Sequence, residues 1–550
     1  MFTRLSSSGG RTYLQLVEAY RNEDGAPRQR VVANLGRLDR LLPKDLDPLI
    51  GGLQRALGRS TETPAVVFDS SKNFGDLFAL HALWSELGLA SALSKALRSS
   101  RRQFDAAALI RTMVFNRLCD PESKLGVLRW LETVAMPDAP EAVSHNHLLR
   151  AMDALMDRVD GVEEAVATQL RPLLDGDLSI VFYDLTTIRI SGSSEVTDDL
   201  RKHGLSKETG GIARQFVLGV IQTADGLPIA HQVHAGNVGE VSTLIPMIEA
   251  TLKRYALKRV VLVADRGLLS LDNLTAIEAL KTASGQPLEY ILAVPGRRYG
   301  EFADLMRATP IADGIGETTW ESRRLVIAHD PERALHQKAA RLATIAELQA
   351  EGERVAQRLD AEDAGTPQRG RKSTDRKAYV RFSEQVKAAS LSRIVKADLE
   401  ADRFCFEIDP QALGEAEALD GRLLLVTNTD FKVEQVIERY KSLADIERGF
   451  RVLKSDIDIA PVHHRLPERI KAHAMICFLA LVLHRVMRQR LRAAGSPLSV
   501  QRALALLQRV QKHHAQIQHK PVTGISRITA EQRDLLRALA LTPPADSSPL

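Results

Sequence analysis

Cysteine and long apolar stretches are both scarce in this sequence of 550 residues. The three cysteines, Cys119, Cys405 and Cys477, stand too far apart for a disulfide framework or a zinc knuckle. The longest uncharged apolar run, Ala474–Leu483, has ten residues, about half of what a membrane span requires. The opening MFTRLSSSGG contains no apolar signal stretch. We therefore expect a cytoplasmic chain without disulfides or a membrane partner.

The composition is otherwise that of an ordinary folded protein. Hydrophobic residues make up 44% and charged residues 26% of the chain, and the mean hydropathy is −0.14. These values exclude fibrous, collagen-like and wholly disordered classes. At roughly 100 to 200 residues per domain, the length predicts about three to five domains.

Positive charge is concentrated in a few segments. The whole chain has 74 basic and 69 acidic residues, but the stretch from His463 to Lys520 has eleven Lys or Arg against one acid. Smaller excesses lie at 369–387 and 95–117. A solvated helix face explains any single cluster, whereas several together favour double-stranded DNA as a partner. The candidate contacts in the largest cluster are Arg488, Arg490 and Arg492.

The first 172 residues divide into two parts. Residues 1–65 contain a predicted β-hairpin at 12–36, because two β-rich runs flank the turn-forming NEDGAP. Residues 66–172 carry apolar residues at helical spacing, as in LFALHALWSELGL. They predict an all-helical domain, which either binds DNA or acts as a scaffold.

Residues 173–298 change to an alternation of strands and helices. LSIVFYDL, QFVLGVIQ and PIAHQVHAG predict three strands in series, and RVVLVAD and EYILAVPG predict two more, each after a helix. This is the order of an α/β, ribonuclease-H-like core, whose first and fourth strands are parallel neighbours. Asp184 and Asp265, at the ends of those two strands, should therefore meet at one edge of the sheet.

An insertion is expected at residues 299–420, where WESRRLVIAH and RFCFEID predict strands and the remainder is charged and helical. The core resumes at 421–495 with the strand GRLLLVTNT and the helical run VEQVIERYKSLADIERGFRVLKS. Residues 496–550 predict a basic helical region with a Pro and Ser tail.

The helical run after the insertion supplies a candidate third acid, Glu447. At about 100° per residue, it shares one stripe with Tyr440, Arg451 and Lys454. Two-metal phosphodiester chemistry requires carboxylates from separate elements to hold ions about 4 Å apart. Magnesium suits such a site because it prefers a few carboxylates plus water and phosphate oxygens. The alternative to an active-site helix is an ordinary surface helix whose charged side chains are solvated.

These motifs resemble those of the DDE transposases of bacterial insertion sequences, specifically the insertion sequence four superfamily and its subgroup numbered sixteen thirty-four. YDLTTI contains the first aspartate and VADRG the second. The third motif is the family signature of Tyr, two residues, Arg, three residues, Glu, six residues and Lys. It stands here as Tyr440, Leu443, Glu447 and Lys454. Leucine thus replaces the signature arginine, which the family associates with transposon-end phosphates, and Arg451 is a candidate substitute.

The resemblance implies an enzyme that cuts the ends of its own mobile element and joins them to target DNA. Asp184, Asp265 and Glu447 would hold magnesium, or manganese in its place. Tyr440, Lys454 and Arg451 would position the DNA strand. A homodimer on DNA, associated with the bacterial nucleoid, is expected.

Two other functions remain open at this point. A metal-dependent DNA nuclease without a joining step would use the same three acids. A catalytically silent DNA-binding regulator derived from a transposase is compatible with Leu443. His463 and His464, in PVHHR, either approach phosphate or have an ordinary surface or packing role.

Overall fold

The structure is a computed structural model that describes most of the chain. It describes residues 1–58, 66–99, 102–174, 179–192, 199–206, 210–255, 257–264, 271–365, 374–400, 402–517 and 520–544. Within these ranges, nothing is described of the side chains at 43, 179, 240, 241, 271–273 and 444–447. Two compact units divide the chain, Met1–Ser71 with His513–Gly524 and Lys72–Lys512 with Ile525–Leu550.

The first unit begins with an antiparallel sheet. β2 (Arg11–Arg21) and β3 (Pro27–Arg37) form the predicted hairpin, and β1 (Phe2–Ser8) pairs with the other edge of β2. Asn22 stabilises the turn because its Oδ1 accepts the N–H of Ala26 at 2.8 Å. Helix α1 (Pro43–Ala56) follows the sheet.

Residues 511–525 differ from the expected basic helices. They contain β16 (Gln511–Ile517) and β17 (Lys520–Ile525), which form a sheet with β4 (Val66–Asn73) in the order β17-β16-β4. The expectation of a wholly helical region at 496–550 is therefore wrong for these two segments. β17 pairs with β16, but the partner of β16 on its other side, β4, lies more than 400 positions earlier, and a partner that distant cannot be seen in a local pattern. The helices of this region are α17 (Val500–Gln508) and α18 (Ala530–Ala538).

Residues 75–170 are helical, as their apolar spacing predicts. Asp105 caps the central helix of this region, because its side chain accepts the N–H of Ala108 at 3.0 Å. The helices are α2 (Gly75–Glu86), α3 (Leu89–Ala96), α4 (Ala106–Cys119), α5 (Gly126–Thr133), α6 (His145–Met156) and α7 (Val159–Leu170), with a short 3-10 turn at Arg171–Leu173.

The long helix α16 (Pro467–Ala493) packs against α4 and α6 and also contacts β8 of the main sheet. By length and composition it could cross a membrane, but 94% of its most apolar window is buried inside the protein. Every residue of Ala474–Leu483 is buried, so the apolar run is a core helix, as expected. Cys477, within it, is a free thiol.

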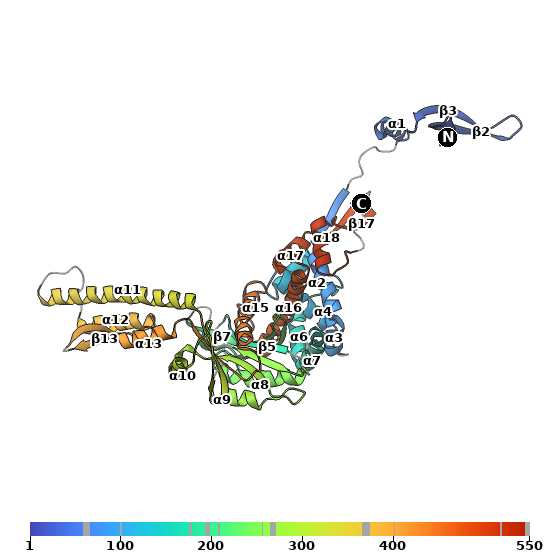
Figure 1. Ribbon diagram of the computed structural model, residues 1–550. Helices are drawn as coiled ribbons and strands as arrows, with labels where there is room; N and C mark the ends of the chain where they lie inside the picture. Colours follow the sequence, from blue (N-terminus) through green and yellow to red (C-terminus); the bar gives the residue numbers. More distant parts are fainter. Residues whose placement is uncertain are drawn as a thin grey trace. The chain divides into compact units, whose positions relative to one another are not determined.

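A nine-stranded mixed sheet forms the centre of the second unit (Figure 1). Its order is β11-β12-β15-β10-β9-β5-β7-β6, and β8 also pairs with β7. β5, β9 and β10 are parallel, and the other pairs are antiparallel. The strands are β5 (Ser179–Arg189), β6 (Lys202–Leu205), β7 (Ile212–Thr223), β8 (Pro228–Ala235), β9 (Val260–Ala264), β10 (Glu289–Ala293), β11 (Ile315–Trp320), β12 (Arg323–His329) and β15 (Arg422–Thr427).

Helices connect the parallel strands and cover the sheet. α8 (Glu240–Arg254) leads to β9, and α9 (Leu271–Ala279) leads to β10. Both lie beside the sheet in green (Figure 1). α14 (Val433–Lys441) contacts β9, β10, β11 and β12, and its Val436 and Ile437 join an apolar cluster with Phe182 of β5.

The insertion expected at 299–420 is only partly separate from the sheet. β11 and β12 extend the main sheet beyond β15, so the expected boundary places them wrongly in the insertion. β12 pairs with β15, a strand about a hundred residues later, and β11 is attached to the sheet through β12. A second apolar cluster, around Phe382 and Phe404, holds the remainder together. Its elements are α11 (Pro331–Asp363), α12 (Asp375–Ala388), β13 (Val395–Glu400), β14 (Arg403–Ile408) and α13 (Pro410–Leu419); before them come the 3-10 segment Gly296–Phe302 and α10 (Ala303–Ala308).

A buried ion pair beside β6 gives a test of this fold. Asp199 accepts hydrogen bonds at 2.7 and 2.8 Å from Arg201, whose side chain is fully buried, and one at 2.9 Å from Arg214. The hydrogen bonds from Arg201, and then the positive charges of Arg201 and Arg214, lower the pKa of Asp199 to about 2. The carboxylate therefore stabilises the fold above its ordinary pKa, and this contribution is lost as the pH falls toward 2.

We expect Asp199→Asn to lower the free energy of unfolding by about 3 kcal/mol at pH 7, because two guanidinium groups lose a buried counter-charge. Urea denaturation followed by circular dichroism measures this change. Asp304→Asn, which breaks an exposed pair with Arg307, should cost less than about 1 kcal/mol. Equal effects of the two substitutions would contradict a structural role for the buried pair.

Candidate functional site

Asp184 lies inside β5 (Ser179–Arg189), so the expectation that it stands at the end of its strand is wrong. The strand continues to Arg189 because β7 pairs with it that far, whereas the parallel pairing with β9 ends at Tyr183. The β-rich run SIVFYDL forms this strand, and Asp184 is half-buried between the buried residues Tyr183 and Leu185. Its Oδ1 accepts the N–H of Leu185 at 2.7 Å. Side chains alternate along a strand, so Asp184 shares a face of the sheet with Phe182.

The end of β9 is in register with this part of β5. Ala264, the last residue of β9, is the Cα partner of Tyr183. The expectation that the first and fourth strands are parallel neighbours is therefore confirmed. Asp265 follows Ala264 directly but lies outside the described residues. Its proximity to Asp184 stays a prediction, which this register favours.

Glu447 lies in α15 (Ala444–Ser455), a helix that contacts both β5 and α16. A Cβ atom at Gly449 would stand 2.7 Å from Nε2 of Gln222 on β7, so α15 approaches the sheet closely there. Gln222 is the Cα partner of Phe182, and directly opposed residues share a face. The backbone of α15 therefore passes over the face that carries Asp184. The Glu447 side chain lies outside the description.

The helical run expected to carry the whole third motif is broken. α14 ends at Lys441 and α15 begins at Ala444. Between them, the N–H of Leu443 bonds the carbonyl of Tyr440, three residues back, at 3.0 Å, whereas an α-helix bonds four residues back. The prediction that Tyr440 shares one helix face with Glu447, Arg451 and Lys454 is therefore wrong. The rotation of about 100° per residue applies only within one continuous helix.

The break separates the third motif into two groups. On α15, Glu447, Arg451 and Lys454 keep their spacing on one helix, and Arg451 is exposed. Tyr440 and Leu443 are partly buried and pack against the apolar cluster of Val436 and Phe182. Leucine in place of the signature arginine therefore has a packing role here.

The three arginines predicted near the end of α16 have different environments. Arg490 pairs with Glu86 of α2 and also donates to the carbonyl of Leu539 at 2.8 Å. Its guanidinium therefore links α16 to α2 and to the residue that follows α18. Arg488 is half-buried, and Arg492 is exposed. Of the three, Arg492 is the most accessible to DNA.

The predicted donors fit a magnesium or manganese ion by their chemistry. Asp184, Asp265 and Glu447 supply only carboxylate oxygens, which these ions prefer. The described side chains contain no group of three His, Cys, Asp or Glu that could hold a metal. Two of the three predicted ligands lie outside them.

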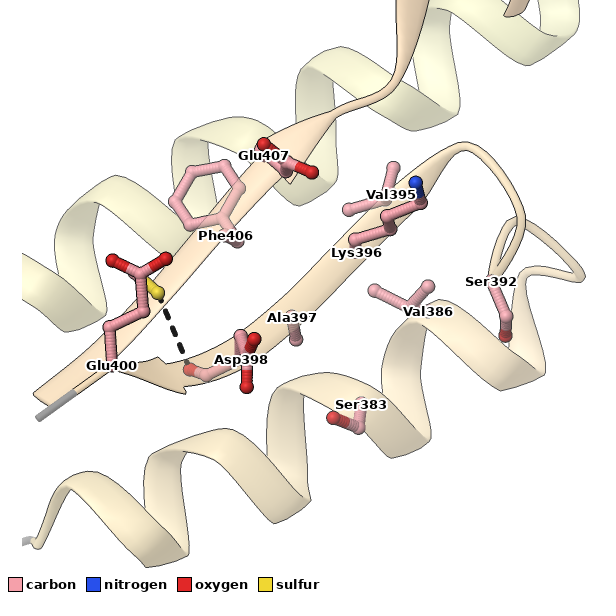
Figure 2. A pocket seen from close by; sticks show the side chains of 11 residues that line it. Ser383, Val386, Ser392, Val395, Lys396, Ala397, Asp398, Glu400, Phe406 and Glu407 are labelled. Atoms are coloured by element: carbon pink, nitrogen blue, oxygen red, sulfur yellow. Dashed lines mark hydrogen bonds between the residues drawn. The ribbon is translucent and has the colours of Figure 1, made fainter. Parts of the chain in front are cut away.

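One cavity in the insertion is unsuited to DNA (Figure 2). It has a volume of about 630 Å³ and lies between α12 and the β13–β14 hairpin. Asp398, Glu400 and Glu407 line it, and Lys396, the cation there, pairs with Asp409 at 2.7 Å. An acidic lining repels phosphate. A second cavity, of about 720 Å³, has a basic lining instead.

Two family models match the chain. The model described as IS1634 family transposase, N-terminal domain, matches residues 3–64. The model described as Transposase DDE domain matches residues 175–483, which is more than half of the chain. The chain belongs to the DDE transposases of the IS1634 group. The transposase therefore acts on DNA, cleaves it and transfers its strands, and requires a divalent metal ion. The resemblance inferred from the motifs is confirmed.

Comparison with curated proteins and with solved structures gives no further information on the function. No curated protein matches the transposase. A cryo-EM structure of the piggyBac transposase synaptic complex with hairpin DNA is similar, with a TM-score of 0.40 and 6% identity over 81% of this chain and 82% of that chain. A likeness at this level carries no inference about the site.

The close approach at Gly449 gives a prediction about the site. Gly449→Ala should displace either α15 or the side-chain amide of the buried Gln222, because the new Cβ would stand 2.7 Å from its Nε2. We expect a loss of about 1 to 3 kcal/mol of stability and a fall in cleavage rate of about 100-fold, since small misplacements of catalytic groups are costly. Cleavage of a labelled duplex carrying one element end measures the rate.

Gly161→Ala is the matched control. Gly161 lies in α7, and no atom stands within 4 Å of the position that its Cβ would occupy. This variant should keep both stability and cleavage. Normal cleavage by Gly449→Ala would show that the close approach of α15 to β7 does not position the site.

Proposed function

We propose that the transposase cuts phosphodiesters at the ends of its own insertion sequence and joins the freed 3′ hydroxyls to target DNA. Asp184, Asp265 and Glu447 would form the site. The observation that supports this proposal is the register of β5 and β9, in which the residue before Asp265 is the partner of the residue before Asp184. In addition, α15 passes over the face that carries Asp184.

We assign these strands to a ribonuclease-H-like core. The order β8-β7-β5-β9-β10 has three antiparallel strands followed by two parallel ones. The helices α8 and α9 make the crossovers that parallel strands require. In such open sheets, functional groups gather beyond the carboxyl ends of the parallel strands, where β9 leads into Asp265.

The three carboxylates would hold magnesium ions, or manganese in their place. When bound, these ions activate the attacking oxygen and stabilise the leaving oxygen. The protein's own task is to hold the DNA strand in line for attack, first by water and then by the 3′ hydroxyl. No serine or tyrosine nucleophile is required, because the DNA and water supply the attacking oxygens.

Cations on α15 would hold the strand. Arg451 and Lys454 lie one and two turns beyond Glu447 on the same helix, so their charges can meet phosphates next to the scissile one. Tyr440, on α14, would contact the strand from the other side of the helix break. Because an insertion sequence has two ends, we propose a homodimer on DNA, with one site for each end.

The three acids can be tested directly. Asp184→Asn, Asp265→Asn and Glu447→Gln should each reduce cleavage of a terminal duplex by more than about 1,000-fold, while end binding changes little, because only metal binding is lost. Gel shift measures binding and gel electrophoresis measures cleavage. Asp445→Asn, on the same helix but off the Glu447 stripe, is the control and should remain active. Retained nicking by all three variants would falsify the assignment, and pre-cleaved ends that fail to join would favour a nuclease.

The substitute role of Arg451 is also testable. Arg451→Ala should weaken end binding by about 5- to 10-fold through loss of one charge-assisted phosphate contact. Fluorescence anisotropy with an end duplex gives the affinity, and Arg451→Lys should restore part of it. Unchanged binding and cleavage in Arg451→Ala would eliminate this role.

A further inference from the structure

The second cavity of the transposase has a basic wall. It has a volume of about 720 Å³ and lies between the loop after α4, at 121–125, and the segment 458–466 that joins α15 to α16. This size is typical of ligand sites. Its wall carries the cations Arg117, Lys124, Arg465 and Arg469 against the acids Glu122 and Asp458.

Lys124 is the unusual member of this wall. Its exposed fraction is 7%, and it makes neither a hydrogen bond nor an ion pair within the described part of the chain. Burial, and then the neighbouring charge of Arg117, lower the pKa of its ammonium to about 7. A buried cation without a counter-charge destabilises a fold. Its retention at a cavity wall suggests that an anion binds there.

The other cations of the wall are held in place without neutralising Lys124. Arg117 is buried and donates to the carbonyl oxygens of Asp458, at 3.0 Å, and of Glu122. These acceptors are uncharged, so the guanidinium keeps its full charge. Arg469 is held by Asp153 at 2.8 Å. Arg465 is exposed at the rim.

Two histidines complete the wall opposite Lys124. The rings of His464 and His473 are tilted against each other with 5.8 Å between their centroids, and His473 bonds the carbonyl of Ile459 at 3.1 Å. Burial, and then the charge of Lys124, lower the pKa of His464 to about 3. Burial also holds the pKa of His473 well below its ordinary value. Both rings are therefore neutral at pH 7, and the positive charge of the cavity comes from the arginines and from the protonated fraction of Lys124.

The segment that lines the cavity is connected to β5 by hydrogen bonds and to α15 by the chain itself. Val462 in its wall exchanges hydrogen bonds with Arg189 and Ser191, at 3.1 and 3.0 Å, at the end of β5. Ile190, which pairs with Val462, follows Asp184 by six positions, or about 20 Å of extended strand. On the other side, residues 456–466 follow α15 directly. Twenty ångströms correspond to about six nucleotides of one duplex strand.

We propose that this cavity binds one backbone phosphate of the transposon-end DNA, several nucleotides from the scissile phosphate, with Lys124 and Arg117 as its principal contacts. The inference rests on the proposed function, because the DNA must lie along β5 and α15. It gives the loop at 121–125 and the PVHHR segment a role in positioning DNA. A free phosphate ion has the same chemistry, and the experiment separates the two sources.

The test measures binding of an end duplex by the full-length protein as a function of salt concentration. Lys124→Met should weaken binding about tenfold and reduce the slope of log affinity against log salt by about 1, the value for one phosphate contact. Its melting temperature should not fall, because the variant removes a buried charge. A lysine with only a structural role would show the reverse, with lower stability and an unchanged slope.

Two controls complete the experiment. Lys253→Met removes an exposed lysine of α8 and should change neither slope nor affinity. Inorganic phosphate should compete with DNA for the wild type more strongly than for Lys124→Met. If phosphate stabilises the wild type but Lys124→Met keeps the full salt slope, the cavity binds a free ion and the proposal is overturned. Asp184→Asn distinguishes a failure of the cavity proposal from a failure of the proposed function. If Asp184→Asn abolishes cleavage while Lys124→Met leaves the salt slope unchanged, phosphate binding in the cavity is refuted and the catalytic role of the acids stands.

Discussion

The pairing of β5 with its two neighbours is the constraint on which the rest of the structure depends. β7 holds β5 from one side in an antiparallel ladder, and β9 holds it from the other in a parallel one. The side-chain period of a strand is two, so a slip of one residue would turn Asp184 to the opposite face. The ladders thus decide which side chains face α15, and the crossover through α8 decides where β9 ends.

The third motif lies close to this sheet although a long insertion separates it from the first two motifs in sequence. The insertion has its own apolar cluster, and closing a long loop costs free energy that grows only slowly with its length. β15 then brings the chain back between β10 and β12. The missing side chain at Gly449 lets α15 come close enough to touch Gln222. A wide separation in sequence is therefore compatible with a compact site.

The basic cavity connects the helical region to the proposed active site. Arg117, at the end of α4, bonds backbone carbonyls of the segment after α15, so the two regions are joined by a buried cation. A protein that maximised stability would replace Lys124 with an apolar residue. Its presence is the kind of local cost that binding sites impose on a fold.

Local pattern was sufficient for much of the fold and for the identity of the candidate acids. The hairpin at 12–36, the helices at 75–170 and the five strands of the core follow from residue type and period. The acids Asp184, Asp265 and Glu447 stand in contiguous motifs that resemble a known family, and the family is confirmed. Such signals depend on neighbouring residues, and so they survive without any knowledge of packing.

Contacts between distant segments decided the remainder. β12 joined the main sheet because β15 offered it hydrogen bonds, β11 joined through β12, and β16 became a strand because β4 lies beside it. The helix broke before Ala444, and Leu443 went to an apolar cluster, although both lie in a run with helical period. Nothing near Lys124 in the sequence marks it as buried. Burial and pairing depend on partners brought together only by folding, and a linear pattern does not contain those partners.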